Sequence, residues 1–370
     1  MKKLLPEVCT IQYGFPFDSA KFSDSNGMPL IRIRDVVRGY SETYTTEEYK
    51  SEYIVHENDL LIGMDGEFNI AKWGKTPALL NQRVCRLAPN DSIDKDYLFY
   101  FMPVALKRIE EKTPFVTVKH LSAKELNKIE IPVLSLEEQR KIAETLSKVD
   151  KLIAFRDQQL AKLDELVKAR FVEMFGDINV NNKKWMTYPL GELCTIVRGG
   201  SPRPIERYLG GTIPWIKIGD ATTGENIYLN STKEYIIQEG VKKSRMIKAG
   251  SLIFANCGVS LGFARIITFD GCIHDGWLAM EDIDEKLDKI FLLYSLNQMT
   301  EYFRKTAPAG TQPNLNTNIM KMHRQIVPPM EMQKAFISFV KCADRQKQIV
   351  QQSLEKLELM KKSLMQEYFG

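Results

Sequence analysis

The sequence of 370 residues lacks the signatures of several protein classes. Its six cysteines form no C-x-x-C pair, so their spacing predicts neither a zinc cluster nor a redox dithiol. The longest uncharged run, which contains residues 251–264, is shorter than the ~20 apolar residues that cross a bilayer. Pro6 and Glu7 interrupt the first apolar stretch before a secretory segment can form. These absences predict a reduced, cytoplasmic chain without a membrane span.

Catalytic motifs are missing as well. Residues 74–76, Gly-Lys-Thr, match the end of a phosphate-binding loop, but Asn69 stands where that motif requires glycine. No Asn-Pro-Pro-aromatic or Asp-Pro-Pro-Tyr tetrapeptide occurs, and no glycine-rich turn suited to S-adenosylmethionine follows a predicted strand. Asp96 and residues 110–112 fit a metal-binding nuclease cluster loosely, and their place on a predicted surface helix favours a solvated charge run.

The four histidines are far apart in the sequence. We interpret each as a surface or hydrogen-bonded core residue rather than as a general base or a metal ligand. These histidines are His56, His120, His274 and His323. A chain with so few catalytic motifs is more simply explained as a binding protein than as a self-contained enzyme.

The composition is that of an ordinary globular protein. Hydrophobic residues make up 44% and charged residues 26% of the chain, which excludes a disordered, collagen-like or purely coiled-coil protein. At roughly 100 to 200 residues per domain, the length predicts two domains. Fifty-one Lys and Arg against 47 Asp and Glu leave a net charge of +4, which permits a nucleic-acid partner without arguing for one.

The chain repeats itself at a long period. Residues 5–11 recur as residues 190–196, an offset of 185, with five of seven positions identical, and residues 29–35 match 214–220 at the same offset. Later matches fall at an offset of 194, after a nine-residue insertion; they pair Thr117, Leu121, Gln139, Asp150, Leu160, Leu163, Phe175 and Gly176 with Thr311, Leu315, Gln333, Asp344, Leu354, Leu357, Phe369 and Gly370. We interpret these matches as a duplication rather than a chance likeness between common strand and helix patterns.

Each copy ends in a long segment of helical periodicity, predicted over residues 137–176 and 331–370. Apolar residues step alternately by four and three positions, which is a heptad seam. Prolines precede both predicted starts, and Gly176 ends the first helix. The predicted seam residues are Ile142, Leu146, Val149, Ile153, Leu160, Leu163, Val167, Phe336, Val340, Val350, Leu354, Leu357 and Leu364.

The 38 residues from Glu137 to Met174 would span about 57 Å as a helix, which is more than a compact domain of this size can bury. One face would remain in water, and the simplest partner is the equivalent helix of the other copy. Antiparallel pairing would place the two mixed segments at opposite ends of a rod, as a pseudo-two-fold dumbbell. The alternative is that each helix packs only on its own domain.

The mixed segments predict α+β domains. Residues 30–37 and 213–218 alternate as strands do, whereas residues 92–111 and 284–305 have helical periodicity. The predicted division is a first mixed domain over residues 1–136, a first long helix over 137–176, a connector with a second mixed domain over 177–330, and a second long helix over 331–370.

The order of several short motifs resembles that of the specificity subunit of type I restriction-modification systems. In the first copy these motifs are residues 60–68 leading to Trp73, 81–84 (Asn-Gln-Arg-Val), 117–122 (Thr-Val-Lys-His-Leu-Ser) and 131–139. Their counterparts in the second copy are residues 250–254, 274–277 (His-Asp-Gly-Trp), 310–315 and 328–333. The second copy departs most at residues 255–263, where the Met-Asp-Gly signature is replaced by Asn-Cys-Gly-Val at residues 256–259. The resemblance covers essentially the whole chain.

This resemblance implies two tandem α/β target-recognition domains separated by a long antiparallel two-helix coiled coil. Each domain would read half of a bipartite, asymmetric DNA site, and the helix pair would set the unread spacer and dock two methyltransferase subunits. Restriction subunits with motor and nuclease activity would also bind. The chain itself would be non-catalytic, with S-adenosylmethionine, ATP and Mg supplied in the partner subunits of an adenine methyltransferase and ATP-dependent endonuclease, and no metal or cofactor of its own.

Candidate DNA-contacting residues follow from side-chain chemistry. Arginine and the amides of Asn and Gln specify bases, whereas lysine mostly holds phosphates. The candidates in the first copy are Arg32, Arg34, Lys72, Lys75, Lys119 and His120, and those in the second are Arg203, Arg207, Lys217, Lys242, Lys243, Arg245, Gln312 and Asn314. Arg32 and Arg34 could instead decorate the outer face of a strand.

Two other functions remain open at this point. The paired domains could belong to a scaffolding or interaction protein, with DNA binding incidental. The chain could also be an RNA-binding protein or a stand-alone enzyme. Selective, salt-sensitive retention of one bipartite duplex would favour the DNA-specificity function over both of these alternatives.

Overall fold

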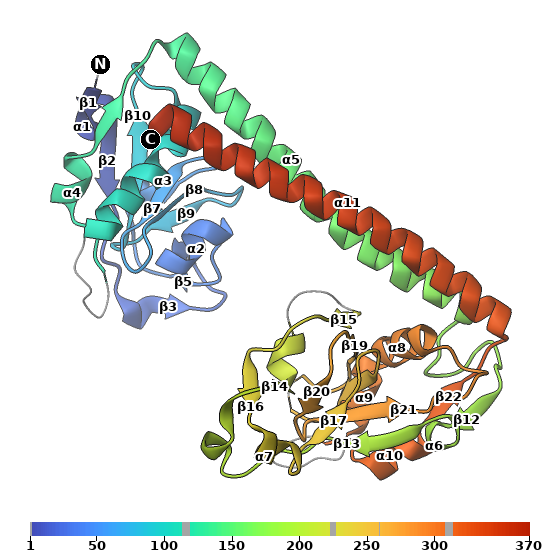
Figure 1. The fold of residues 1–370 in the computed structure, drawn as a ribbon. Helices are drawn as coiled ribbons and strands as arrows, with labels where there is room; N and C mark the ends of the chain where they lie inside the picture. Colours follow the sequence, from blue (N-terminus) through green and yellow to red (C-terminus); the bar gives the residue numbers. More distant parts are fainter. Residues whose placement is uncertain (1, 113–118, 223–226, 259, 308–313) are drawn as a thin grey trace. The chain divides into compact units, whose positions relative to one another are not determined.

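The computed structural model describes residues 2–112, 119–222, 227–258, 260–307 and 314–370. Two compact units divide the chain: unit 1 comprises residues 1–157 and 351–370, and unit 2 comprises residues 158–350. Each unit contains one mixed domain and one half of each of the two long helices, α5 (Leu136–Phe175) and α11 (Met330–Phe369) (Figure 1). None of the helices in the described part of the chain is both long and apolar enough to span a membrane.

The amino-terminal domain is the part of unit 1 that precedes α5. It has a four-stranded antiparallel sheet in the order β2-β10-β7-β8, a five-stranded sheet in the order β3-β5-β4-β9-β6 in which β4 and β9 are parallel, and the pair β1-β11. Its elements are β1 (Lys2–Leu4), α1 (Leu5–Val8), β2 (Cys9–Tyr13), β3 (Phe22–Ser23), β4 (Met28–Ile31), α2 (Ile33–Arg38), β5 (Tyr44–Thr45), β6 (Ile54–Val55), β7 (Leu60–Gly63), β8 (Asn69–Lys72), β9 (Ala78–Leu80), β10 (Val84–Pro89), α3 (Lys95–Lys112), α4 (Ala123–Asn127) and β11 (Glu130–Pro132), with 3-10 turns η1 (Ser19–Lys21) and η2 (Ser51–Tyr53).

The central domain is the part of unit 2 between α5 and α11. Its sheets have the orders β13-β21-β18-β19-β15 and β16-β14-β20-β17, with β14 and β20 parallel, beside the pair β12-β22. Its elements are β12 (Thr187–Pro189), α6 (Leu190–Leu193), β13 (Thr195–Arg198), β14 (Leu209–Ile216), β15 (Tyr228–Leu229), β16 (Glu234–Ile236), α7 (Gln238–Val241), β17 (Arg245–Ile247), β18 (Leu252–Ala255), β19 (Ala264–Ile267), β20 (Gly271–Ile273), β21 (Trp277–Glu281), α8 (Lys289–Gln298), α9 (Thr300–Thr306), α10 (Thr317–Met322) and β22 (Arg324–Ile326), with η3 (Ile205–Arg207) and η4 (Ile218–Ala221).

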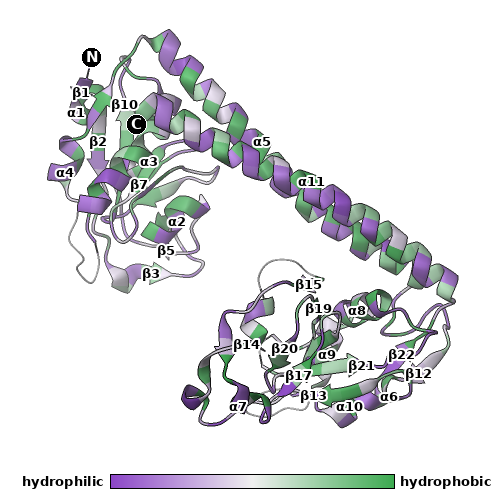
Figure 2. Cartoon of the chain, viewed as in Figure 1, coloured by the Kyte–Doolittle hydropathy of each residue, from purple (hydrophilic) through white to green (hydrophobic). Residues whose placement is uncertain are grey.

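Each domain buries both faces of one sheet, because successive side chains on a strand point to opposite sides. On β18, Leu252 and Phe254 face the helical side of the core, whereas Ile253 and Ala255 face the second sheet. On β7, Leu60 and Ile62 lie in the helical core and Leu61 lies with the second sheet. β7 and β18 are accordingly continuous apolar runs that are buried throughout, and β21 is largely green in Figure 2.

The long helices differ from their predicted ranges by one residue at each end. Gly176 has φ +77° and closes the first helix by donating its backbone N–H to the carbonyl of Val172. A fully buried glutamine anchors each helix start. Gln139 Oε1 accepts the backbone N–H of Asp94 at 2.8 Å, and Gln333 Oε1 accepts that of Asp288 at 2.8 Å. The duplicated glutamines therefore tie each long helix to the start of α3 or α8.

The helices pair antiparallel in each unit, as the seam predicted. In unit 1, Lys361 Nζ lies 2.7 Å from Asp150 and Arg156 Nε donates to Ser353 Oγ at 3.1 Å. In unit 2, Lys347 is ion-paired with Asp164, and the rings of Phe171 and Phe336 are 5.3 Å apart. All thirteen predicted seam residues are buried or half-buried. Several polar interruptions of the seam therefore reach partners on the other helix.

The last residues of each long helix pack against the mixed domain of the other copy. This finding excludes the alternative in which each helix packs only on the domain of its own copy. Phe175, at the end of α5, contacts Phe291 of α8 with ring centroids 4.8 Å apart. Phe369, at the end of α11, contacts Tyr97 of α3 at 5.3 Å. These two contacts lie at repeat-equivalent positions, as the sequence match of Phe175 with Phe369 predicted.

Two sequence predictions need correction. The predicted strand over residues 30–37 ends at Ile31 and is followed by α2, because the Asp35 carboxylate accepts the Arg32 backbone N–H at 2.8 Å and Gly39 closes the turn with φ +74°. Arg32 and Arg34 therefore do not decorate one strand. The predicted helix over residues 284–305 is divided into α8 and α9 at Met299.

His323 is half-buried in unit 2 and its ring centroid lies 5.1 Å from that of Phe303. Burial lowers the pKa of His323 to about 4, whereas the pKa of an unfolded histidine is ~6.5. Below pH ~6.5 the unfolded chain therefore binds a proton that the folded chain does not. We predict that unit 2 loses about 2 kcal/mol of stability between pH 7 and pH 5.

Denaturant unfolding at the two pH values measures this loss. In His323→Leu the loss should shrink, because the leucine cannot take up a proton in the unfolded chain. An equal loss in both proteins would contradict the assignment to His323.

Candidate nucleic-acid interface

Strand ends bring a cluster of polar side chains together in the amino-terminal domain. Because β4 and β9 are parallel, the residues that follow them, Arg32 and Asn81, lie side by side at one edge of the sheet. Residues 81–83 also contact the turn after β7, since the Met64 backbone N–H donates to the Arg83 carbonyl at 3.0 Å. We call Arg32, Asp65, residues 81–83 and His120 the amino-terminal cluster.

Asp65 joins two donors of this cluster. One carboxylate oxygen lies 2.5 Å from His120 Nδ1, and the other lies 3.5 Å from Arg83 Nε. The Asp65 side chain is 18% exposed, whereas those of His120 and Arg83 are 50% and 52% exposed. A largely buried carboxylate therefore orients two exposed hydrogen-bond donors.

The central domain has a corresponding cluster after the parallel strands β14 and β20. Ser201 Oγ donates to Asp275 Oδ1 at 2.7 Å, and Arg198 Nε donates to the Asp275 carbonyl at 2.9 Å. His274 Nδ1 lies 3.1 Å from Asp275 and accepts the Gly276 backbone N–H at 2.9 Å. We call Arg198, Ser201, Arg203, Lys217, His274, Asp275 and Asn314 the central cluster.

Electrostatics in the central cluster favour a neutral imidazole and an ionised carboxylate. Burial lowers the pKa of His274, and Lys217, Arg203 and Arg198 lower it further against the opposing effect of Asp275. Burial raises the pKa of Asp275, but the Ser201 hydroxyl, Arg198 and Arg203 act in the opposite direction, and the net shift of this pKa is downward. A neutral His274 can both accept and donate a hydrogen bond through its ring.

The two clusters stand on the same backbone frame. Gly14 N–H donates to the Val84 carbonyl at 3.1 Å, and Gly199 N–H donates to the Trp277 carbonyl at 2.9 Å. Leu121 N–H donates to the Met64 carbonyl at 2.7 Å, and Leu315 N–H donates to the Asn256 carbonyl at 2.8 Å. An isolated bridge joins Asp65 to His120 in one domain and Cys257 to Asn314 in the other.

Different side chains occupy this shared frame. The pairs of equivalent positions are Arg32 and Lys217, Asn81 and His274, Asp65 and Cys257, and His120 and Asn314. Burial raises the pKa of Cys257, so this position has a neutral thiol. The equivalent position of the amino-terminal domain has the Asp65 carboxyl group that contacts His120. The fold is duplicated, whereas the chemistry presented by the loops is not.

The structure brings together some of the residues that the sequence suggested. Arg32 and His120 belong to the amino-terminal cluster, and Arg203, Lys217 and Asn314 belong to the central cluster. Lys242, Lys243 and Arg245 border the central cluster, because Ser244 Oγ donates to the Gly200 carbonyl at 2.8 Å. Arg207 is exposed on η3 close to Tyr208, which accepts a hydrogen bond from Lys243.

Other suggested residues lie elsewhere. Lys72 Nζ is 2.8 Å from Asp96, and Lys119 Nζ donates to the Glu110 carbonyl at 3.0 Å, so both engage α3. Arg34 lies on α2 beside Asp35, and Lys75 is exposed in the turn between β8 and β9. Gln312 lies outside the described residues.

Reasoning from side-chain type missed several members of the clusters. These are Asp65, Asn81, Gln82, Arg83, Arg198, Ser201, His274 and Asp275. The motif at residues 81–84 and its counterpart at 274–277 were the available signal, because they mark the same loop in both copies. Among the described residues, no group of three or more His, Cys, Asp or Glu side chains is arranged to hold a metal ion.

The chain belongs to the family of type I restriction modification DNA specificity domains, whose model matches residues 1–165 and 182–359. The two matched stretches correspond to the two copies of the repeat. The fold is also similar to that of a solved structure, the S subunit of the type I restriction-modification system from M. genitalium. The two chains superpose with a TM-score of 0.56 at 16% sequence identity, and the match covers 100% of this chain and 96% of the S subunit.

Two relatives show how the similarity is distributed. The specificity subunit of the Escherichia coli type I restriction enzyme EcoBI is 41% identical over 164 residues, which is 44% of this chain and 34% of that subunit. The specificity subunit of the type I restriction enzyme MjaVIII from Methanocaldococcus jannaschii is 24% identical over 377 residues, which is 91% of this chain and 87% of that subunit. The match with EcoBI therefore spans about a third of that relative, and the match with MjaVIII spans most of both chains.

Proposed function

We propose that this chain is the sequence-specific DNA-recognition subunit of a type I restriction-modification complex. Each mixed domain reads one half of a bipartite, asymmetric double-stranded site, and the helix pair sets the spacer between the halves. The family match supports this function. The observation that carries it is the pair of clusters, in which one backbone frame presents two different sets of hydrogen-bonding side chains.

The chemistry of the clusters suits the reading of bases. Arginine donates two hydrogen bonds to guanine, and Asn and Gln pair with adenine through the major groove. Arg32, Arg83, Asn81 and Gln82 supply these groups in the amino-terminal cluster. The central cluster offers Arg198, Arg203, His274 and Asn314 instead. Since equivalent positions differ, the two half-sites are expected to differ in sequence.

The helix pair has a repeated pattern of exposed apolar residues that supports docking of two methyltransferase subunits. Phe155 and Ile349 are repeat equivalents and are 53% and 60% exposed. Leu166 and Met360 are also equivalents and are 50% and 52% exposed. Unit 1 contains Phe155 and Met360, and unit 2 contains Leu166 and Ile349. Each unit thus offers an equivalent pair of side chains to one copy of the same partner.

We predict that Phe155→Ser and Ile349→Ser each reduce the assembly to one methyltransferase copy, and that the double variant carries none. Loss of a large apolar contact from an interface centre costs roughly 2 kcal/mol or more. Native mass spectrometry of the co-produced complex measures the stoichiometry. Met322→Ser, at a residue that is 78% exposed outside the helix pair, is the matched control. Full stoichiometry in the double variant would exclude these residues from docking.

Catalysis belongs to the partner subunits in this proposal. Methyltransferase subunits supply S-adenosylmethionine and adenine methylation, and motor nuclease subunits use ATP and Mg for translocation and cleavage, in the cytoplasm. The chain contributes specificity. Because both readers are held by the helix pair, lengthening or shortening the helices is expected to change the spacer.

Gel shifts on a random duplex pool test the proposed function. The chain is used with and without a co-produced methyltransferase subunit, and retained duplexes are sequenced. The expected result is selective, salt-sensitive retention of one bipartite sequence. Retention of duplex without sequence preference at any salt concentration would contradict the proposal.

We predict that Asp65→Asn weakens reading of one half-site only. The amide keeps the shape of the carboxylate but loses the charge that orients His120 and Arg83, so each lost base contact costs roughly 1–3 kcal/mol. Binding to duplexes with single changes in each half-site measures the effect. Asp270→Asn, at an exposed carboxylate that pairs with Lys248 outside both clusters, is the control. Equal loss of discrimination at both half-sites would contradict the role of Asp65.

A further inference from the structure

The amino-terminal domain contains an aromatic pocket that the amino-terminal cluster does not include. Its cavity of about 330 Å³ is lined by Phe15, Phe17, Glu48, Tyr49, Lys50 and Tyr53. The rings of Phe15 and Phe17 are 5.0 Å apart at 72°, and those of Phe15 and Tyr53 are 5.4 Å apart at 52°. Phe15 and Tyr49 are 37% and 43% exposed. Flat apolar surfaces therefore converge on a cavity that is open to solvent.

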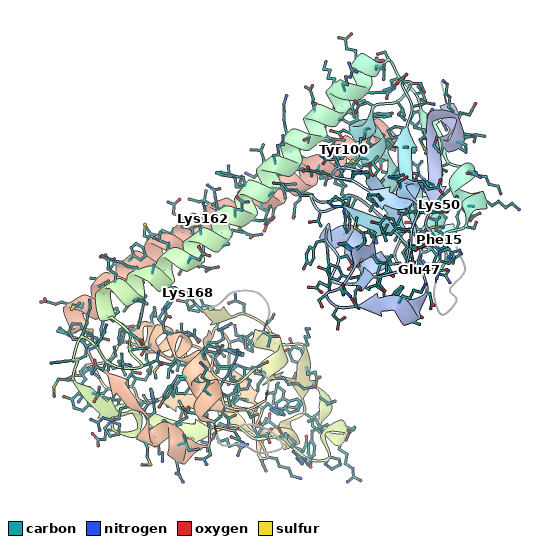
Figure 3. All side chains as sticks on the ribbon, turned by 180° about the vertical axis from the view of Figure 1, so that it is seen from behind. Phe15, Glu47, Lys50, Tyr100, Lys162 and Lys168 are labelled. Atoms are coloured by element: carbon teal, nitrogen blue, oxygen red, sulfur yellow. The ribbon has the colours of Figure 1, made fainter. Side chains whose placement is uncertain are left out.

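Two clamps hold the walls of this pocket in place. The Glu47 carboxylate accepts the backbone N–H of Asp18 at 2.7 Å, which joins the Phe15–Phe17 loop to the segment that carries Tyr49. Arg86 donates to the carbonyls of Glu52 and Ile54 at 2.9 and 2.8 Å, which fixes the backbone on both sides of Tyr53. Phe15, Glu47 and Lys50 lie near one another in the domain (Figure 3). The pocket is thus preformed.

The pocket adjoins the residues proposed to read bases. Phe15 forms an isolated bridge with Asn81, and the Gln82 backbone N–H donates to the Phe15 carbonyl at 3.0 Å. Gly14 permits this approach, because a Cβ there would lie 2.1 Å from the Asn81 carbonyl oxygen. In the central domain, strand pairing puts Arg245 at the position of Tyr53. This position is therefore cationic in the central domain and aromatic in the amino-terminal domain.

We propose that this pocket receives one unpaired nucleobase of the first DNA half-site. The rings of Phe15, Tyr49 and Tyr53 offer stacking surfaces that every base can use. The Glu48 carboxylate can accept a hydrogen bond from an exocyclic amino group, and the Lys50 ammonium can hold a flanking phosphate. This inference rests on the proposed function. It adds the claim that the specificity subunit itself takes one base out of the DNA stack.

The volume agrees with one base. Small-molecule sites occupy roughly 300–1,000 Å³, and the cavity of about 330 Å³ is at the lower end of that range. The lining combines a mostly apolar wall with two charged groups of opposite sign, as a flat ring with a polar edge requires. A paired base in the groove would not need a pocket with several ring walls.

A mismatch scan tests the inference. Unpairing a base costs free energy, and a mismatch removes much of that cost in advance. At the one position whose base enters the pocket, a mismatch that keeps this base should tighten binding by the full chain with its methyltransferase partner, by roughly tenfold. Tyr49→Ala should weaken binding to the matched site by roughly 5- to 150-fold through lost stacking. The variant should also abolish the mismatch effect at that position.

Controls separate this inference from the proposed function. Tyr302→Ala removes a tyrosine of similar exposure, 42%, from α9 of unit 2 and should leave both measurements unchanged. Tyr49→Phe should retain the mismatch effect, because the ring remains. A methyltransferase that flips its own target base would give a mismatch effect that Tyr49→Ala leaves intact.

The outcomes are distinct. A Tyr49-dependent mismatch effect at one position of the first half-site supports the inference. If wild type binds its bipartite site selectively but every mismatch effect is the same in Tyr49→Ala, the inference is wrong and the proposed function stands. If wild type shows no selective binding, both are overturned.

Discussion

Replacing residues 177–330 with the corresponding segment of a relative is expected to change one half-site completely and to leave the other intact. The replaced segment contains the whole central cluster and no residue of the amino-terminal cluster. It begins after Gly176, which closes α5, and ends where α11 starts. The helix seam and the amino-terminal domain therefore stay as they are. The proposed function makes the effect large, because it assigns each half-site to one domain alone.

Sequencing of duplexes selected from a random pool measures the outcome of this exchange. The spacer should also stay the same, because both long helices are unchanged. Exchanging residues 1–136 instead is the reciprocal control and should change only the other half-site. A single exchange that altered both half-sites would show that the domains do not read independently.

Phe336→Ala is expected to produce the largest loss of stability. The Phe336 side chain is fully buried, and its ring lies 5.3 Å from Phe171, 5.6 Å from Phe175 and 5.2 Å from Tyr294. Truncation of such a side chain costs about 3–5 kcal/mol, as lost transfer energy and as a cavity. This loss corresponds to a fall in melting temperature of roughly 6–20 °C for a unit of this size.

Thermal unfolding followed by circular dichroism measures this loss. The control is Phe155→Ala, which removes the same side chain from a site on the helix pair that is 53% exposed and should change stability by less than ~0.5 kcal/mol. A melting temperature unchanged in Phe336→Ala would contradict the aromatic core as the joint between α5, α8 and α11.

The long helices could be predicted from the sequence because their signal is local. Apolar residues at heptad spacing, prolines ahead of each start and Gly176 at one end all act within a few residues of the backbone they shape. The sequence repeat also paired Gln139 with Gln333, but it did not indicate that these residues anchor the helix starts. Each forms three hydrogen bonds. Two of the three join segments about 45 residues apart, and no local pattern encodes such a contact.

The error at residues 30–37 has a clear physical origin. Alternation of apolar and charged residues predicted one strand, but the Asp35 side chain caps the backbone of Arg32 and starts a helix. A short capping interaction therefore outweighs strand periodicity. The equivalent Asp220 accepts the backbone N–H of Lys217 at 2.8 Å, so the same interruption recurs in the second copy, and comparing the two copies could have revealed it.

The candidate site was only partly predictable. Residue type suggested Arg32, His120, Lys217 and Asn314 as DNA contacts, and the strand ends place these four residues in the clusters. It could not identify Asp65, because an acidic side chain argues against DNA binding until its contacts with His120 and Arg83 are known. It also suggested Lys72 and Lys119, which lie outside the clusters and contact residues of α3. Tertiary contacts decide which charges are available to a ligand.

Methylome sequencing of cells that carry this chain with its methyltransferase and restriction partners tests the central claim most directly. Two different readers on one helix pair predict a single methylated motif with two unlike halves and a fixed unread spacer. A motif that is continuous or palindromic, or methylation with no dependence on this chain, would contradict the account.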